Sequence, residues 1–213
     1  MTIANKHHTI AISLLWLFHI SGIIGISLGY ESWFMPKTSI NLLVVLGIVI
    51  LAYNLLSKKS LALFILISIL GFFAEVLGVN YGWFFGNYKY GENLGVKLLG
   101  VPLLIGINWG ILSLVTAKLA TEISPKLSLF FQAFIGAALM LILDFFMEAS
   151  APKFDFWRFE NSMVPLSNYI AWFAFAYIFN LILLYFKILG NFKIALHIYI
   201  AQLIFFIYFY VYF

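Results

Sequence analysis

The sequence predicts an all-α integral membrane protein, a single bundle of about seven transmembrane helices. Three observations carry this prediction. Of its 213 residues, 64% are hydrophobic and only 9% are charged, whereas soluble domains carry about 25% charged residues. The mean hydropathy is +1.06. Apolar stretches long enough to cross a hydrocarbon core of about 30 Å, which takes about 20 residues, recur along the whole chain.

Seven segments qualify as spans. They cover approximately residues 9–30, 39–56, 60–79, 98–120, 127–148, 164–186 and 194–213. Each should be a helix, because a backbone exposed to lipid must satisfy its own hydrogen bonds. The two-residue alternation typical of a membrane β-barrel is absent. The length suits one polytopic membrane domain, residues 1–213, with no room for a second.

Lysine and arginine residues predict the orientation. With seven spans, the side that holds the N-terminus carries seven basic residues and the other side carries five. The seven are Lys6, Lys58, Lys59, Lys118, Lys126, Lys187 and Lys193. Because basic loops stay on the cytoplasmic side, we expect a cell (inner) membrane protein with a cytoplasmic N-terminus and a non-cytoplasmic C-terminus. Basic residues that flank apolar runs in this way do not indicate a nucleic-acid partner.

Acidic residues lie near the outer ends of two predicted helices. Glu75 is about 23 Å along its helix from Ser60, and Asp144 is about 26 Å along from Leu127, at a rise of ~1.5 Å per residue. Asp144 and Glu148 are four residues apart and share one helix face. Intramembrane carboxylates indicate a functional site, although bonding between helices is the alternative. We therefore take Glu75, Asp144 and Glu148 as candidate catalytic acids.

An internal repeat connects the two acidic regions. Glu75 precedes an aromatic loop and then GVPLLIGINW (100–109), whereas Glu148 precedes an aromatic loop and then MVPLSNYIAW (163–172). Each copy therefore contains an acid, rings, Val-Pro-Leu, an asparagine and a tryptophan. Two such hairpins facing one another would form one pocket with two halves, unless the similarity is a coincidence.

Aromatic and amide side chains concentrate beside these acids. Aromatic faces stabilise cations where water is excluded, so a protonated acid among them suits the formation of a carbocation. An interfacial aromatic belt is the alternative explanation for any single ring. The expected pocket residues are Asn80, Tyr81, Trp83, Tyr88, Tyr90, Lys97, Asn108, Trp157, Asn168 and Trp172.

Other chemistries lack the residues that they need. There are no cysteines, so no thiolate and no Cys-ligated metal is available. His19 and His197 stand alone, which favours a core or interfacial role, and no metal-ligand spacing occurs. The G-x-S-x-G motif of serine hydrolases and glycine-rich phosphate loops are also absent. We expect no metal site.

Three stretches resemble the carotenoid-biosynthesis membrane hydratases, a family that includes γ-carotene 1′-hydratase and bisanhydrobacterioruberin hydratase. They are FAEVLGVNYGWFFGNYKYGENLGVKLLGVPLLIGINW (73–109), LDFFMEASAPKFDFWRF (143–159) and VPLSNYIAWF (164–173). The resemblance implies addition of water to the terminal C=C of a carotenoid ψ-end group, without a cofactor. A carboxylic acid would protonate the alkene, and water would capture the tertiary cation.

The roles that follow are expectations. Glu75 is the first choice for the proton donor, and Asp144 is the second or the base that orients water. Lys97 is expected as a counter-charge at the pocket mouth. The partners expected are a long polyene, water, membrane lipids and other enzymes of carotenoid biosynthesis.

Two alternative functions remain open. A lycopene-type carotenoid cyclase shares the protonation step but uses an internal alkene as the nucleophile. A non-catalytic lipophile transporter or binding protein would usually contain helices broken at mid-span. Pro102 and Pro165 lie instead where helices are expected to begin.

Overall fold

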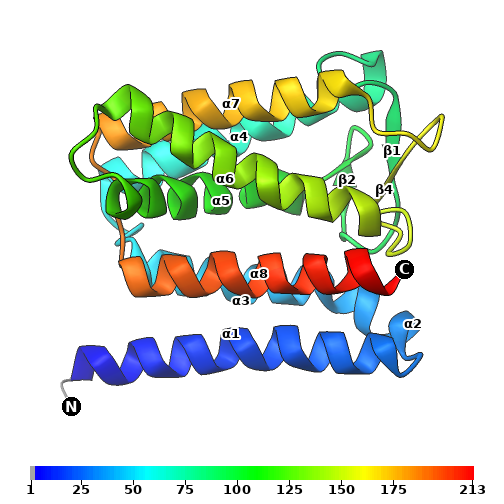
Figure 1. Cartoon of the computed structure of the whole chain (residues 1–213), viewed down its shortest axis with the longest axis horizontal. Helices are drawn as coiled ribbons and strands as arrows, with labels where there is room; N and C mark the ends of the chain where they lie inside the picture. Colours follow the sequence, from blue (N-terminus) through cyan, green and yellow to red (C-terminus); the bar gives the residue numbers. More distant parts are fainter. Residues whose placement is uncertain (1–2) are drawn as a thin grey trace.

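The long helices run side by side along the length of the molecule (Figure 1). The computed structural model describes residues 3–213, and side chains from residue 7 onward, so the Lys6 side chain lies outside the described part. The helices are α1 (Ile3–Ser27), α3 (Thr38–Ala52), α4 (Lys58–Tyr81), α5 (Leu103–Ile123), α6 (Leu129–Ser150), α7 (Leu166–Tyr185) and α8 (Phe192–Tyr212). Within the described residues, seven spans are long and apolar enough to cross a membrane. The predicted fold class, a multi-pass helical membrane protein, is confirmed.

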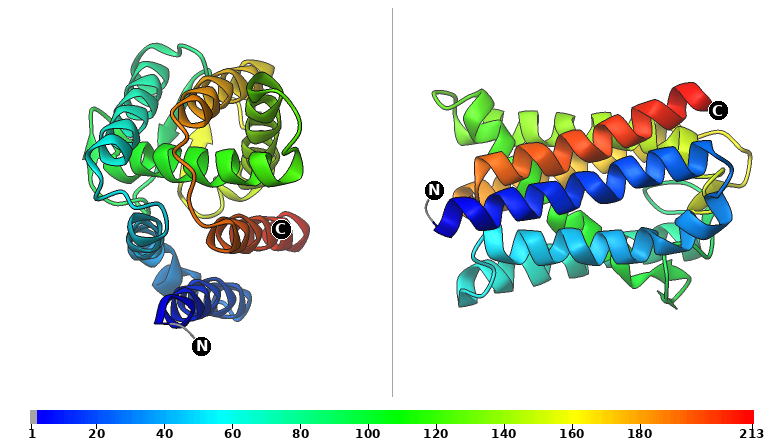
Figure 2. Two further views of the ribbon diagram at one scale, coloured as in Figure 1. Left: turned by 90° about the vertical axis from the view of Figure 1, so that its left-hand side faces the viewer. Right: turned by 90° about the horizontal axis from the view of Figure 1, so that it is seen from below.

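Helix α5 lies at the centre of the bundle. It packs against α4, α6, α7 and α8, and most of its side chains are buried. Seen along the helix axes, α4, α6 and α7 lie on one side of α5, whereas α1, α3 and α8 lie on the other (Figure 2). Helix α1 is outermost and packs mainly against α8. The bundle therefore has two unequal parts with α5 between them.

Polar caps define several helix starts. Ser57 accepts a hydrogen bond from the Ser60 amide at 3.3 Å, and Asn191 accepts one from the Ile194 amide at 3.1 Å. These bonds satisfy amide groups that have no partner within the helix. At its other end α4 stops at Gly82, which adopts the left-handed conformation with φ of 68°. The chain then leaves the helix and enters the first of two outer loops, residues 82–102 between α4 and α5.

The second outer loop, residues 151–165, connects α6 and α7. The two outer loops join through a small sheet. Strand β1 (Tyr88–Tyr90) pairs antiparallel with β4 (Trp157–Phe159), and Tyr90 lies opposite Trp157. The C-terminus lies at the same end of the bundle, and the N-terminus lies at the other (Figure 1). Both outer loops and the C-terminus therefore lie at one end of the bundle.

One local expectation was wrong. The fourth span was expected to begin at residue 98, but β2 (Lys97–Leu98) and β3 (Val101–Pro102) form a hairpin there and α5 begins at Leu103. Leu99 and Gly100 have positive φ values of 53° and 83°, which turn the chain between the strands. A short helix, α2 (Glu31–Phe34), and a 3-10 turn, η1 (Met35–Lys37), also precede α3.

Candidate active site

Glu75 is the most extensively hydrogen-bonded acid in the outer half of the bundle. It projects from α4 and is only 3% exposed. Tyr88 and Tyr90 donate their hydroxyl groups to Oε2, the latter at 2.8 Å, and the Trp109 indole donates to Oε1 at 2.9 Å. All three donors are neutral. The carboxyl group is thus held in one orientation without a cation beside it.

Two glycines on α4 allow these donors to approach. Gly71 and Gly78 lie four residues before and three residues after Glu75, on the same helix face. A Cβ atom at Gly71 would lie 2.6 Å from Cβ of Trp109, and one at Gly78 would lie 2.9 Å from the Tyr88 hydroxyl. Any larger residue would displace a donor. The glycines are therefore part of the geometry around the acid.

The two tyrosines retain their protons. Burial raises the pKa of Tyr88 well above its ordinary value, and the neighbouring Glu75 carboxylate adds to the effect. Burial and the same carboxylate likewise raise the pKa of Tyr90. Ionised phenols would place further negative charge beside Glu75. Both residues consequently act as hydrogen-bond donors.

The other two acids, Asp144 and Glu148, lie on α6. Glu148 accepts hydrogen bonds from the Trp157 indole at 2.8 Å and from the Asn168 amide at 3.0 Å. The same Asn168 amide is 3.4 Å from Oδ2 of Asp144, whose Oδ1 is buried without a hydrogen-bond partner. Asn168 therefore bridges the two acids from the first turns of α7.

The two halves of the internal repeat meet in space. Tyr90, which donates to Glu75, and Trp157, which donates to Glu148, are paired across β1 and β4, with ring centroids 6.1 Å apart. Deeper in the bundle the two final tryptophans of the repeat, Trp109 and Trp172, stack on one another. The pocket expected between two hairpins of similar design is present.

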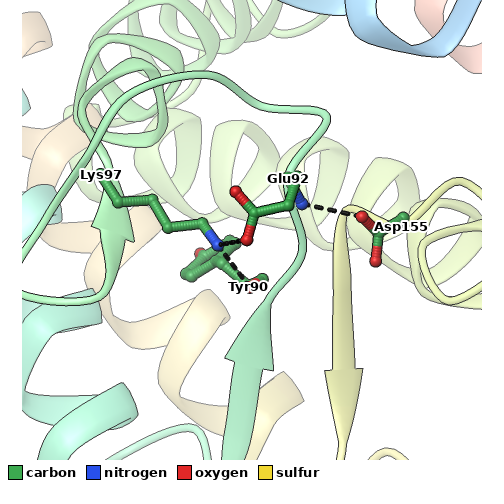
Figure 3. Close-up of polar contacts among 4 residues, drawn as sticks. All are labelled: Tyr90, Glu92, Lys97 and Asp155. Carbon is green, nitrogen blue, oxygen red and sulfur yellow. Dashed lines mark hydrogen bonds and ion pairs between the residues drawn. The ribbon is translucent and has the colours of Figure 1, made fainter.

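Lys97 stabilises the first outer loop. Its ammonium group donates to the Tyr90 carbonyl at 3.0 Å and forms an ion pair with Glu92 at 2.7 Å (Figure 3). The Glu92 amide in turn donates to Asp155 at 2.8 Å, which links this loop to the second one (Figure 3). Lys97 thus fixes the backbone of Tyr90.

One cavity of about 310 Å³ connects these groups. Two of the candidate acids, Glu75 and Glu148, lie in its wall, and Asp144 does not. Six other expected pocket residues also line it: Tyr88, Tyr90, Asn108, Trp157, Asn168 and Trp172. The wall is otherwise mainly apolar and aromatic, including Phe156 and Phe159 from the second loop.

Four expected pocket residues lie elsewhere. Tyr81, the last residue of α4, and Trp83, which follows the left-handed turn at Gly82, are 68% and 57% exposed and contact each other. The Asn80 amide donates to the carbonyls of Val76 and Leu99, both at 2.9 Å, and so ties the end of α4 to the β2–β3 turn. Lys97, the fourth, belongs to the loop contacts described above.

Trp109 was missed at the sequence level. It donates to Glu75 and lines the cavity. The repeat contained the necessary signal, because Trp109 occupies the position that corresponds to Trp172. His19, Asn41 and Gln202 also line the cavity and were not expected there.

Comparisons with known proteins identify the family of the chain. The model of a family described as carotenoid biosynthesis protein matches residues 37–213. A bisanhydrobacterioruberin hydratase from Haloarcula japonica is 24% identical over 133 residues, which is 56% of this chain and 43% of the relative. The chain thus matches less than half of the length of that relative. No solved structure matches the chain.

Proposed function

Because this chain belongs to the carotenoid biosynthesis protein family, we propose that it is a cofactor-independent carotenoid hydratase. It adds water to the terminal C=C of a ψ-end group through a tertiary carbocation. One observation carries the proposal: Glu75, held by three neutral donors, faces an apolar cavity lined with aromatic rings. The hydratase relative supports the same reaction class.

Glu75 is the proton donor in this proposal. In its protonated form it transfers the proton to the less substituted carbon of the terminal C=C, and the tertiary cation forms on the adjacent carbon. The hydrogen bonds from Tyr88, Tyr90 and Trp109 stabilise the carboxylate that remains. The faces of the surrounding rings stabilise the cation, since aromatic faces attract cations where water is excluded.

Glu148 is the base in the second step. Water bonds to the cationic carbon and loses a proton to Glu148, which lies in the same cavity wall as Glu75. Return of one proton to Glu75 through solvent restores the site, so that the net change is addition of one water molecule. Asp144 is a positioning residue, because it acts through the Asn168 amide. Asn108, whose side chain makes no hydrogen bond with any described residue, is available to hold water in the cavity.

The cavity volume limits what enters it. A volume of about 310 Å³ corresponds to ~10 water molecules at ~30 Å³ each. That space accommodates the end of a long polyene rather than all of it. We therefore propose that the reactive end group occupies the cavity while the remaining polyene extends into the surrounding lipid.

Expression in a host that accumulates a linear carotenoid tests this function. Mass analysis of the pigments should show a product heavier by one water molecule, and Glu75→Gln should abolish it. An isomer of unchanged mass would support the cyclase alternative. Unaltered pigment, with the protein present in the membrane, would favour a non-catalytic lipophile-binding protein.

A further inference from the structure

The cavity extends away from the acids towards the other part of the bundle. Beyond α5, its wall is formed by α1, α3 and α8, which lie on the opposite side of α5 from α4 and α6 (Figure 2). Six polar side chains lie in this wall: His19 and Ser21 on α1, Lys37 on η1, Thr38 and Asn41 on α3, and Gln202 on α8. Ser21 and Lys37 donate to the Phe18 and Trp33 carbonyls, whereas His19, Asn41 and Gln202 direct polar atoms without such a partner to the cavity. The proposed reaction uses none of them.

His19 presents an acceptor in this wall. It is 4% exposed, and its Nδ1 lies 2.8 Å from the Leu15 carbonyl oxygen. A carbonyl oxygen only accepts, so Nδ1 carries a proton. In the neutral ring Nε2 is then an unprotonated acceptor, and the neutral form is expected because no acid contacts this buried ring.

Gln202 presents donors and an acceptor close by. It is 7% exposed, and its amide makes no hydrogen bond with any described residue. Phe205, three residues later on the same helix face, packs edge-on against His19 with ring centroids 6.1 Å apart. The imidazole and the amide therefore belong to one stretch of the wall.

Nε2 of His19 and the Gln202 amide make no hydrogen bond with any described residue. The Asn41 Oδ1 atom is buried without a hydrogen-bond partner. Most buried polar groups in proteins have a partner, and one left without it costs free energy. The partner most readily accommodated in the adjoining cavity is a ligand group that both donates and accepts.

We propose that His19, Gln202 and Asn41 form a hydroxyl-binding subsite in the cavity. A hydroxyl group donates to Nε2 of His19 and accepts from the Gln202 amide, with Asn41 as a further contact. Its source is either an alcohol group of the polyene or a water molecule. The subsite rests on the proposed function in one respect, that the cavity receives a polyene end group. His19 lies outside residues 37–213, the range matched by the family model.

Two terpenoid probes of one skeleton test the subsite. Geraniol carries a terminal C=C and a hydroxyl group, and 2,6-dimethyl-2,6-octadiene lacks only the hydroxyl. Their dissociation constants for the purified full chain in detergent can be followed by tryptophan fluorescence. We expect geraniol to bind about fivefold more tightly, which is the effect of one net hydrogen bond of ~1 kcal/mol. The variants His19→Phe and Gln202→Leu should each bring the ratio close to one.

Tyr199→Phe is the matched control. It removes a hydroxyl group from the same helix, α8, but that group donates to the Leu139 carbonyl at 2.9 Å and Tyr199 does not line the cavity. The preference for geraniol should be unchanged in this variant. If it falls as far as in Gln202→Leu, then the preference does not arise in the subsite.

Turnover of a linear carotenoid distinguishes the two sources of the hydroxyl. Equal binding of both probes, together with slower hydration in Gln202→Leu, would assign the subsite to water. Equal binding in every variant with unchanged hydration would overturn the proposal. The protein could also prefer geraniol in a way that depends on Gln202 and yet hydrate no carotenoid. That result would support the subsite and contradict the hydratase function.

Discussion

Trp109 and Trp172 stack face to face, with ring centroids 3.9 Å apart and ring planes inclined by 21°. They come from α5 and α7, and each ends one copy of the internal repeat. Only the Trp109 indole donates to Glu75. The stack therefore holds that donor in place, while Trp172 contributes its ring.

This difference predicts unequal effects of two similar substitutions. Trp109→Phe retains an aromatic ring but removes the hydrogen bond to Glu75, which should lower kcat about tenfold or more, because bonds to charged groups contribute ~1.5–3 kcal/mol. Trp172→Phe should have a smaller effect, because its indole makes no hydrogen bond with any described residue. The two variants are compared by their hydration rates in membranes that contain equal amounts of the protein. A larger loss from Trp172→Phe would contradict the assignment of Trp109.

Replacement of the proton donor should abolish most of the activity. Glu75→Gln keeps the size and accepts hydrogen bonds through its carbonyl, but it does not supply a comparably acidic proton. The expected loss is about 10²–10⁴-fold, the usual contribution of a general acid. Glu160→Gln, at an exposed acid of the second outer loop, is the control and should have normal activity. Near-normal turnover in Glu75→Gln would show that Glu75 is structural.

Gly78 should be essential for activity, because no larger residue fits beside Tyr88. In Gly78→Ala the new Cβ would lie 2.9 Å from the Tyr88 hydroxyl and from the Phe85 ring, so Tyr88 should move away from Glu75 and activity should fall. Gly47→Ala in α3 is the control, since nothing lies within 4 Å of a Cβ there. That change should preserve activity and stabilise the helix by up to ~1 kcal/mol. Assays paired with thermal unfolding separate the two effects, and unimpaired activity in Gly78→Ala would count against the role of Tyr88.

The sequence predicted seven spans, because their number depends on hydropathy and length alone. It also indicated that two hairpins share a pocket. It did not predict that Asn80, Tyr81 and Trp83 leave the pocket. Asn80 and Tyr81 are the last residues of α4, and Trp83 follows the left-handed turn at Gly82, so their directions depend on where that helix ends. It ranked Asp144 above Glu148, because both acids share one helix face and only the packing of α7 decides which reaches the cavity.

The raised pKa values of Tyr88 and Tyr90 predict how stability depends on pH. Both phenols stay protonated in the folded protein at pH values where an unfolded tyrosine, with a pKa of about 10, ionises. Their contribution is therefore complete below about pH 10 and is lost as the pH rises towards the raised values. The Tm of the purified protein should fall above that pH, and less steeply in Tyr88→Phe. An identical slope in the variant would contradict the raised pKa of Tyr88.

The orientation in the membrane is a separate prediction. Reporter fusions after Lys58 and after Phe213 should report opposite sides, because these positions lie at opposite ends of the bundle. From the excess of lysines we expect the Lys58 side to lie in the cytoplasm. Fusions that report the same side would contradict seven spans, and a reversed result would contradict only the orientation.

The origin of the new hydroxyl group tests the central claim most directly. Membranes containing the protein should hydrate a linear carotenoid without O₂ or a reductant, because the proposed acids act by proton transfer alone. In labelled water the product should contain one ¹⁸O atom in its hydroxyl group and one solvent deuteron on the adjacent carbon. Label that arrives from ¹⁸O₂ instead, or a deuterated isomer without added oxygen, would contradict a hydratase.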